Sequence, residues 1–227
     1  MNVVITGANR GLGFGFVQHY LSQGCDVWGC YRSGPDQLEG VSSSRLHTLQ
    51  WDVTEEKPAR FADEAGFPER IDLLINNAGV YGPKDGAGQA LSTVTPETML
   101  SVYDVNCVGP LRVVQALLPR IMAARGTIAN LSSKMGSSAD NGSGGCYAYR
   151  AAKAALVIVS KSMAVDLAPD GVRVITLHPG WVRTAMTSHS GLIDIDESVA
   201  GMSDVIQKID HYELGAFVAY NGQVVPF

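Results

Sequence analysis

The stretch that decides the fold is Thr6-Gly7-Ala8-Asn9-Arg10-Gly11-Leu12-Gly13. It follows an apolar run at residues 2–6 and opens an amphipathic stretch at residues 12–23, which predicts a strand, a glycine-rich turn and a helix. Glycines let such a turn bend tightly and approach a pyrophosphate, which binds to the amides and the dipole at the helix N-terminus. The turn therefore predicts a nucleotide-binding site at the start of the first helix.

The glycines alone leave alternatives open. Gly11-Leu12-Gly13-Phe14-Gly15 also fits the G-x-G-x-G pattern that methyltransferases and other nucleotide-binding proteins use. A tight strand-to-helix turn with close packing and no ligand would need the same residues. The choice depends on motifs further along the chain.

The rest of the chain alternates short apolar runs with longer amphipathic stretches. The apolar runs do not alternate with polar residues, as expected for parallel strands covered by helices on both faces. The pattern predicts an α/β fold of the Rossmann type: a doubly wound parallel sheet of about seven strands in a single domain, residues 1–227. The predicted strands are 2–6, 26–31, 46–51, 71–76, 127–132, 172–178 and 217–220; the predicted helices are 12–23, 55–65, 96–124 with a break possible at Pro110, 147–168 and 197–209.

Composition excludes several classes of protein. The 227 residues are 46% hydrophobic, which suits one full core, and 22 acidic residues exceed 17 basic ones, which disfavours nucleic-acid binding. No apolar run approaches the roughly 20 residues of a membrane span, and no basic region precedes residues 3–6 as in a signal peptide. The four cysteines form no C-x-x-C and no histidine has metal-ligand spacing. We expect a cytoplasmic protein with reduced thiols and no metal.

Five further motifs follow the glycine-rich turn in order. They are Asn76-Asn77-Ala78-Gly79, Val105-Asn106, Ser132-Ser133, Tyr149-x-x-x-Lys153 and Pro179-Gly180-Trp181-Val182-Arg183-Thr184. Together with the turn they resemble the short-chain dehydrogenase/reductase family over nearly the whole chain. Residues 146–156, the sequence His178-Pro179-Gly180-Trp181-Val182 and the C-terminal residues resemble Sniffer-type carbonyl reductases and bacterial C-factor proteins in particular.

The resemblance implies a catalytic set. Tyr149 would be the general acid/base, and Lys153, four residues later on the same helix face, would lower the tyrosine pKa and bind the ribose hydroxyls. Ser133 would hydrogen-bond the substrate carbonyl, and Asn106 would hold a proton-relaying water. Two neighbours compete for these roles. Tyr147 lies on another helix face than Lys153, and Ser132 is the first of a pair of which the family usually uses the second.

The cofactor is predicted from the end of the second strand, Trp28-Gly29-Cys30-Tyr31-Arg32, which lacks the acid that accepts the adenosine ribose hydroxyls in NAD-dependent relatives. Asp36 lies too far into the next turn to replace it, whereas Arg10 and Arg32 suit a 2′-phosphate. We therefore expect NADP(H) rather than NAD(H). The remaining cofactor contacts implied are Gly7, Asn9, Gly11 and Leu12 at the turn, Asp52 and Val53 at adenine, Asn77, Ala78 and Gly79 at the ribose, and Pro179, Gly180, Val182 and Thr184 at the carboxamide.

The leading hypothesis is an NADP(H)-dependent oxidoreductase that interconverts a small carbonyl compound and its alcohol. A nucleotide-sensing protein of cell–cell signalling, like the C-factor relatives, is the alternative; a sugar-nucleotide epimerase or a methyltransferase fits fewer motifs. The substrate pocket would draw on residues 80–88, 137–145 and 181–194, where Tyr81, Trp181, Met186 and Leu192 are either pocket or packing residues. A homodimer or homotetramer is expected through helices 96–124 and 147–168, although sequence does not separate interface from core; Val102, Val105, Val113 and Leu117 are examples.

Overall fold

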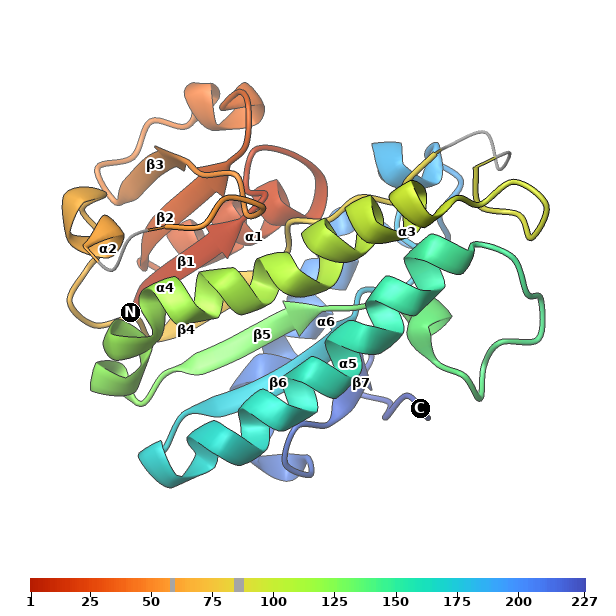
Figure 1. The fold of residues 1–227 in the computed structure, drawn as a ribbon. Helices are drawn as coiled ribbons and strands as arrows, with labels where there is room; N and C mark the ends of the chain where they lie inside the picture. Colours follow the sequence, from red (N-terminus) through yellow and green to blue (C-terminus); the bar gives the residue numbers. More distant parts are fainter. Residues whose placement is uncertain (58–59, 84–87) are drawn as a thin grey trace.

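The computed structural model describes residues 1–57, 60–83 and 88–227. A single parallel sheet of seven strands forms its centre, with the spatial order β3-β2-β1-β4-β5-β6-β7 (Figure 1). This order confirms the predicted doubly wound α/β fold, because the chain runs to one edge from β1 and then restarts at β4. The strands are β1 Asn2–Thr6, β2 Asp26–Tyr31, β3 Leu46–Gln50, β4 Leu73–Asn76, β5 Thr127–Leu131, β6 Arg173–His178 and β7 Phe217–Ala219.

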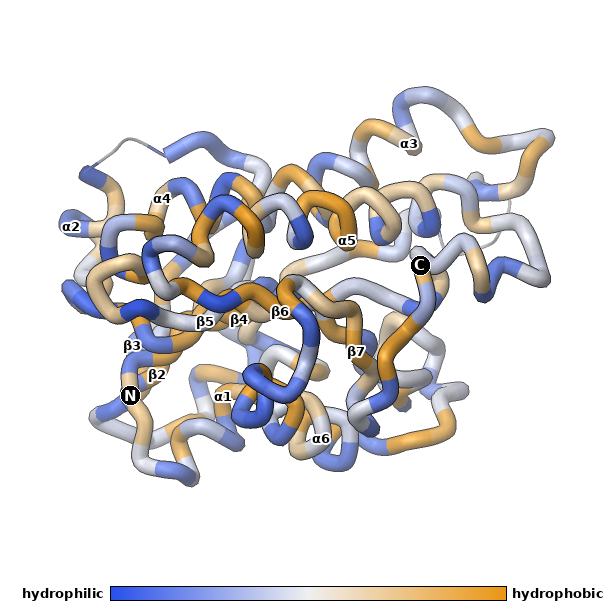
Figure 2. The backbone as a smooth tube through the Cα atoms, turned by 90° about the horizontal axis from the view of Figure 1, so that it is seen from below, coloured by the Kyte–Doolittle hydropathy of each residue, from blue (hydrophilic) through white to orange (hydrophobic). Residues whose placement is uncertain are grey.

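The strands are apolar without alternation because helices cover both faces of the sheet. Val3 and Ile5 of β1 belong to the core cluster with Phe16, whereas Val4 belongs to the opposite cluster with Leu117. Figure 2 shows α1 (Gly11–Ser22) and α6 (Ile195–Gln207) on one side of the sheet, and α4 (Gly109–Ala124) and α5 (Tyr147–Leu167) on the other. Only the edge strand β3 has exposed residues at several positions.

Element boundaries agree with the sequence prediction to within two residues for all seven strands and for α1, α5 and α6. The predicted helix over residues 55–65 is wrong, because the structure has only the short α2, Phe61–Glu64. The Asp52 carboxylate accepts bonds from the Thr54 backbone N–H at 2.9 Å and its hydroxyl at 2.8 Å, which stabilises a turn. Pro58 also disfavours helical backbone at Lys57, and residues 58–59 themselves lie outside the described part.

The long helix predicted at residues 96–124 is interrupted, but earlier than Pro110. It consists of α3 (Pro96–Tyr103), a π-helical turn (Asp104–Val108) and α4. Pro110 has no N–H, so the Asn106 carbonyl four residues earlier lacks its usual helical partner. The Gly109 N–H bonds to the Asp104 carbonyl, five residues back, rather than to a carbonyl four residues back. The wider turn carries Asn106.

Residues 96–124 taken as one stretch are long and apolar enough to cross a membrane, which the inspection of single apolar runs missed. In the fold α4 lies against the sheet and α3 packs against α5, and 39% of the apolar window is buried. Val113 and Leu117 have no exposed surface and Val102 has almost none, so these residues are core and not interface. Packing within the domain therefore explains these three residues, whereas Val105 is only partly buried.

Candidate active site

The glycine-rich turn joins β1 to α1. Gly7 and Gly11 have φ of +62° and +56°, values that side chains other than glycine rarely adopt. A Cβ on Gly13 would lie 2.1 Å from the Gly7 carbonyl oxygen, so this position permits the helix to start directly beside the turn. Arg10 is the N-cap of α1 and its side chain does not cap the helix. The helix therefore begins with a closely packed backbone and no side-chain cap of its own.

Replacing Gly13 with alanine tests this close approach. The added methyl group would overlap a backbone oxygen, and we expect a loss of about 3 kcal/mol or more in the free energy of unfolding, or about 6–12 °C in Tm. Gly142→Ala is the matched control, because a Cβ there meets nothing within 4 Å. Equal Tm values for the two variants in a thermal melt would contradict the packing argument.

Asn77, just after β4, fastens the glycine-rich turn to the next strand. Its side-chain Nδ2 donates to the carbonyl oxygens of Thr6 and Gly7, each at 2.9 Å. The Thr6 hydroxyl in turn accepts bonds from the backbone N–H groups of Asn77 and Ala78 at 3.1 Å. The motifs at residues 6–13 and 76–79, far apart in sequence, thus form one unit at the carboxyl edge of the sheet.

The two arginines predicted to bind a 2′-phosphate are exposed, Arg10 in the turn and Arg32 directly after β2. Within the described residues neither guanidinium has a hydrogen-bond or ion-pair partner. Asp36 contacts the glycine-rich turn, because Asn9 Nδ2 donates to its carboxylate at 2.6 Å. The residues between β2 and Asp36 fold back over Asn9, which also donates to the Gly34 carbonyl at 2.9 Å. That Asp36 does not replace the missing acid of β2 stays a prediction.

Asp52 and Val53 follow the neighbouring strand β3. Partial burial raises the pKa of Asp52, but the Thr54 hydrogen bonds and the Arg32 charge outweigh burial, and its pKa lies below the ordinary value. Val53 is buried against the start of α4, where a Cβ on Gly109 would come within 2.9 Å of it. Asp52 is thus a carboxylate held ionised beside Arg32.

The catalytic candidates come together from three elements. Tyr149 and Lys153 lie one turn apart on α5, both buried, and the Lys153 Nζ is 5.8 Å from the centre of the tyrosine ring. Lys153 Nζ donates to the Leu131 carbonyl at the end of β5 at 2.8 Å. A Cβ on Gly79 would lie 2.8 Å from Asn106 Oδ1 and 3.6 Å from Lys153 Nζ, so both side chains flank Gly79.

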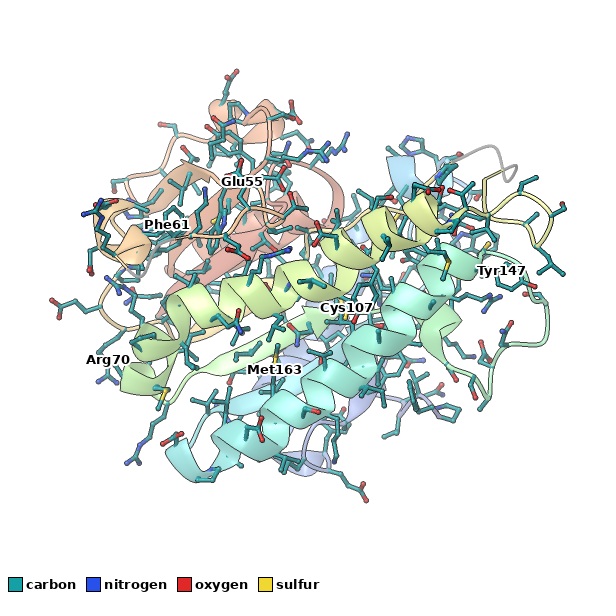
Figure 3. The ribbon with its side chains drawn as sticks, in the orientation of Figure 1. Glu55, Phe61, Arg70, Cys107, Tyr147 and Met163 are labelled. Atoms are coloured by element: carbon teal, nitrogen blue, oxygen red, sulfur yellow. The ribbon has the colours of Figure 1, made fainter. Side chains whose placement is uncertain are left out.

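Asn106 is held by the chain after β4. Its Oδ1 accepts from the Val80 N–H at 3.0 Å and its Nδ2 donates to the Val80 carbonyl at 2.7 Å. The next residue of the π-helical turn, Cys107, is also buried, and Figure 3 shows it where the turn meets α5. The irregular turn therefore places the Asn106 side chain, whose amide oxygen and nitrogen both bond to Val80, beside Lys153.

Burial dominates the electrostatics of the pair on α5. It raises the pKa of Tyr149 to about 12, with the Ser133 hydroxyl acting in the opposite direction, and it lowers the pKa of Lys153 to about 8. The prediction that the lysine lowers the tyrosine pKa is therefore wrong, because burial raises that pKa. Tyr149 is a protonated phenol at neutral pH, and Lys153 is a cation close to its titration range.

The two competing assignments are separated by geometry. Tyr147 is 39% exposed, whereas Tyr149 is 8% exposed and faces Ser133. Ser132 donates its hydroxyl to the Lys153 carbonyl at 2.8 Å and so joins β5 to α5. These contacts support Tyr149 and Ser133 as the reacting pair and give Ser132 a structural part.

The residues predicted for the nicotinamide side follow β6. The Pro179 carbonyl accepts from the Ser198 hydroxyl at 2.6 Å, and Gly180 has φ of +85°. Val182 is buried and bridges to Ile193. Thr184 returns to the glycine-rich turn, where its Cγ2 would be 4.0 Å from a Cβ on Gly11. The segment thus closes over the same edge of the sheet.

The predicted substrate side is formed by less regular segments. Trp181, Met186 and Leu192 are 53%, 44% and 70% exposed, so they are not core residues. Tyr81 is half-buried, with its ring centre 4.9 Å from that of Tyr149. Of the segment 80–88, residues 84–87 lie outside the described part. Within the segment 137–145, residues 138–145 are exposed, whereas Ser137 is buried and donates its hydroxyl to the Pro226 carbonyl. Arg150 holds the exposed loop, because its Nη2 donates to the Ser143 hydroxyl at 2.8 Å.

Comparison with known proteins decides the family. The model of the short chain dehydrogenase family matches residues 1–192. The chain belongs to this family. As a short-chain dehydrogenase it is an oxidoreductase. It is 42% identical over 158 residues to C-signal of Myxococcus xanthus, a match that covers 69% of this chain and 93% of that protein.

Solved structures agree with this family over the full chain. Carbonyl reductase Sniffer of D. melanogaster superposes with a TM-score of 0.90 at 30% identity and covers 100% of this chain and 99% of its own. An NADPH-bound carbonyl reductase from chicken fatty liver has a TM-score of 0.89 at 30% identity, with 100% and 98% covered. The predicted resemblance to this part of the family is confirmed.

The sequence did not reveal two residues beside the site. Gln89 is 2% exposed and bonds to the backbone of Tyr149, and Cys107 packs beside Lys153. Neither belongs to a motif, and a buried glutamine in a loop has no local signal. Among residues 1–57, 60–83 and 88–227, no three His, Cys, Asp or Glu side chains are grouped as metal ligands would be.

Proposed function

We propose that this short-chain dehydrogenase is an NADPH-dependent carbonyl reductase that converts a small aldehyde or ketone to its alcohol. The observation that carries the proposal is the convergence of Ser133, Tyr149, Lys153 and Asn106 at the carboxyl edge of the sheet, beside the glycine-rich turn. The likeness to the two carbonyl reductases supports the same direction of reaction. When bound, the cofactor supplies the hydride.

Each residue of the catalytic set has a distinct task. The Ser133 hydroxyl donates a hydrogen bond to the substrate oxygen and orients the carbonyl. Tyr149 gives its phenolic proton to that oxygen as negative charge develops on it. The Lys153 cation stabilises the phenolate that remains, and Asn106 holds a water through which the proton is replaced. Because its pKa is raised to about 12, the Tyr149 phenol begins protonated, as a proton donor must.

The residues around the turn fit a dinucleotide with a 2′-phosphate. The N-terminus of α1 has no side-chain cap, and a helix N-terminus binds anions. Arg10 and Arg32 add two guanidinium groups at the adenosine end, and no acid ends β2. These features support NADP(H) over NAD(H).

Removing both guanidinium groups tests the cofactor preference. We expect Arg10→Ala/Arg32→Ala to raise the Kd for NADPH by about 100-fold or more, because each charge-assisted bond to phosphate contributes about 1.5–3 kcal/mol. The Kd for NADH should change less than about twofold. Fluorescence titration measures both, and Arg45→Ala, whose side chain pairs with Asp26 and the Gly24 carbonyl, is the control. A wild-type Kd for NADH equal to or below that for NADPH overturns the preference.

The side chains of the predicted substrate segments suit a modest apolar carbonyl compound. Tyr81 lies against Tyr149, and the exposed Trp181, Met186 and Leu192 provide apolar surface on the segment after β6. The first experiment is NADPH consumption over a panel of aldehydes, diketones and quinones. Turnover ranks the substrates and supports a reductase; the absence of turnover with demonstrable NADPH binding contradicts it.

A second function is favoured by the similarity to C-signal. The alternative is a nucleotide-sensing protein of cell–cell signalling with little turnover. An intact catalytic set is not needed for nucleotide binding alone, and this supports the reductase.

Three other features stay predictions: the cytoplasmic location, the single NAD(P)-binding domain over residues 1–227, and a homodimer or homotetramer. The exposed side chains of Leu100, Ile158 and Val165 on α3 and α5 are available for such an interface.

A further inference from the structure

The helix that carries Tyr149 begins without a cap of its own. The N-cap residue Cys146 has left-handed backbone, with φ of +51°, and its side chain makes no capping bond. The first N–H groups of a helix have no partner within the helix and need one elsewhere. At α5 one of these groups is the backbone N–H of Tyr149 itself, because Tyr149 is the third residue of the helix.

Gln89, sixty positions away in the chain, supplies the missing acceptors. Its side-chain Oε1 accepts from the Tyr149 N–H at 3.0 Å, and its backbone carbonyl accepts from the Tyr147 N–H at 3.3 Å. The side chain is 2% exposed, so water does not compete for these bonds. The capping bond is therefore made across the fold, at the residue whose position matters for proton transfer.

The other end of the Gln89 amide is held as firmly. Its Nε2 donates to the Tyr81 carbonyl at 2.7 Å. Gly82 makes room for this amide, because its φ is +97° and a Cβ there would lie 3.1 Å from Nε2 and 3.0 Å from Val102. Both polar ends of the glutamine are thus satisfied, and the side chain has one orientation.

The segment Val80-Tyr81, to which Gln89 bonds, also binds the Asn106 side chain. Val80 pairs with the Asn106 side chain through both its N–H and its carbonyl, and Tyr81 is the next residue. The π-helical turn and α5 are therefore linked through two consecutive residues, with Asn106 at one end and Tyr149 at the other. The spacing between these two side chains depends on this link.

We propose that Gln89 is a positioning residue that caps α5 across the fold and sets the place of Tyr149 relative to Asn106. The consequence for turnover rests on the proposed function, whereas the cap itself does not. Gln89→Leu removes both side-chain bonds at similar volume. Gln89→Glu keeps an acceptor for the Tyr149 N–H at the helix N-terminus, where an anion is favoured, but it loses the donor to the Tyr81 carbonyl.

Turnover and binding separate positioning from general destabilisation. For Gln89→Leu we expect kcat to fall by about 10- to 100-fold, as small displacements of reacting groups do, while the Kd for NADPH stays within about twofold. The deuterium isotope effect from NADPH labelled at the transferred position should increase, because the chemical step becomes slower. Gln89→Glu, which keeps the cap but not the bond to Tyr81, should recover part of the lost kcat.

Thr95→Val is the matched control, since it removes the N-cap bond of α3, where the Thr95 hydroxyl accepts from the Thr98 N–H at 3.2 Å. Both Gln89→Leu and Thr95→Val should lower Tm by about 2–4 °C. Only Gln89→Leu should change kcat and the isotope effect. Equal kcat losses in the two variants, or wild-type kcat in Gln89→Leu, overturns the inference.

Amide hydrogen exchange gives a readout that needs no turnover. In the wild-type protein we expect the Tyr149 amide to be protected, and in Gln89→Leu to exchange at least tenfold faster, with amides in the middle of α5 changed much less. Unchanged protection at Tyr149 overturns the cap. If the wild-type protein reduces no member of the carbonyl panel but loses this protection on substitution, the proposed function fails and the cap stands.

Discussion

Tyr149→Phe is expected to lower kcat for carbonyl reduction by about 10²- to 10⁴-fold, the usual contribution of a general acid. The substitution removes only the phenolic oxygen. The ring, which packs 4.9 Å from that of Tyr81, stays in place, so the Kd for NADPH and the Tm should remain close to the wild-type values. Steady-state NADPH oxidation with the best substrate of the panel, followed by fluorescence titration of the cofactor, measures both.

Tyr147→Phe is the matched control for that variant, because it removes the same atom from the same helix at a partly exposed position. It should retain full turnover. A variant at Tyr149 that keeps wild-type kcat, or equal losses at both positions, contradicts the assignment of Tyr149 as proton donor. Loss of activity together with loss of NADPH binding would indicate that the phenol serves the cofactor site instead.

Lys153→Met is expected to abolish most turnover, by about 10²-fold or more, without a large loss of stability. Burial lowers the pKa of Lys153 to about 8, which corresponds to roughly 3 kcal/mol of cost for keeping the cation in the fold at neutral pH. The cost is full below pH 8 and disappears as the pH rises towards the unfolded value of 10.5. Methionine removes this cost but leaves the Leu131 carbonyl without its 2.8 Å partner, a loss of about 1–3 kcal/mol.

The two contributions nearly cancel, so the free energy of unfolding at pH 7 should change by no more than about 2 kcal/mol in denaturant titration. Such a small change in stability distinguishes Lys153, whose burial as a cation is unfavourable, from a structural lysine, whose removal would destabilise the fold. A loss of stability of about 4 kcal/mol or more, with turnover reduced only in proportion to the folded fraction, would contradict the functional reading. Lys161→Met, on an exposed face of the same helix, is the control for helix substitution.

Some features of the site follow from the sequence alone. Tyr149 and Lys153 were found because a helix places residues four apart on one face, and that relation is local. The expectation that Lys153 lowers the pKa of Tyr149 was wrong, since desolvation depends on the surrounding atoms and outweighs the effect of one neighbouring charge. The importance of Gln89 and the nearness of Asp36 to Asn9 could not be read from sequence, because both arise where a loop folds over a distant residue.

By itself the sequence determined the order of strands and helices, the parallel sheet and the location of the glycine-rich turn. These follow from apolar runs, helical spacing and the backbone freedom of glycine, all of which act over a few residues. Only the tertiary structure decided how the side chain of Asn106 is held by Val80 and how α5 is capped by Gln89. The reason is physical: each of these depends on which hydrogen-bond partner a group meets across the fold, and such partners have no fixed distance along the chain.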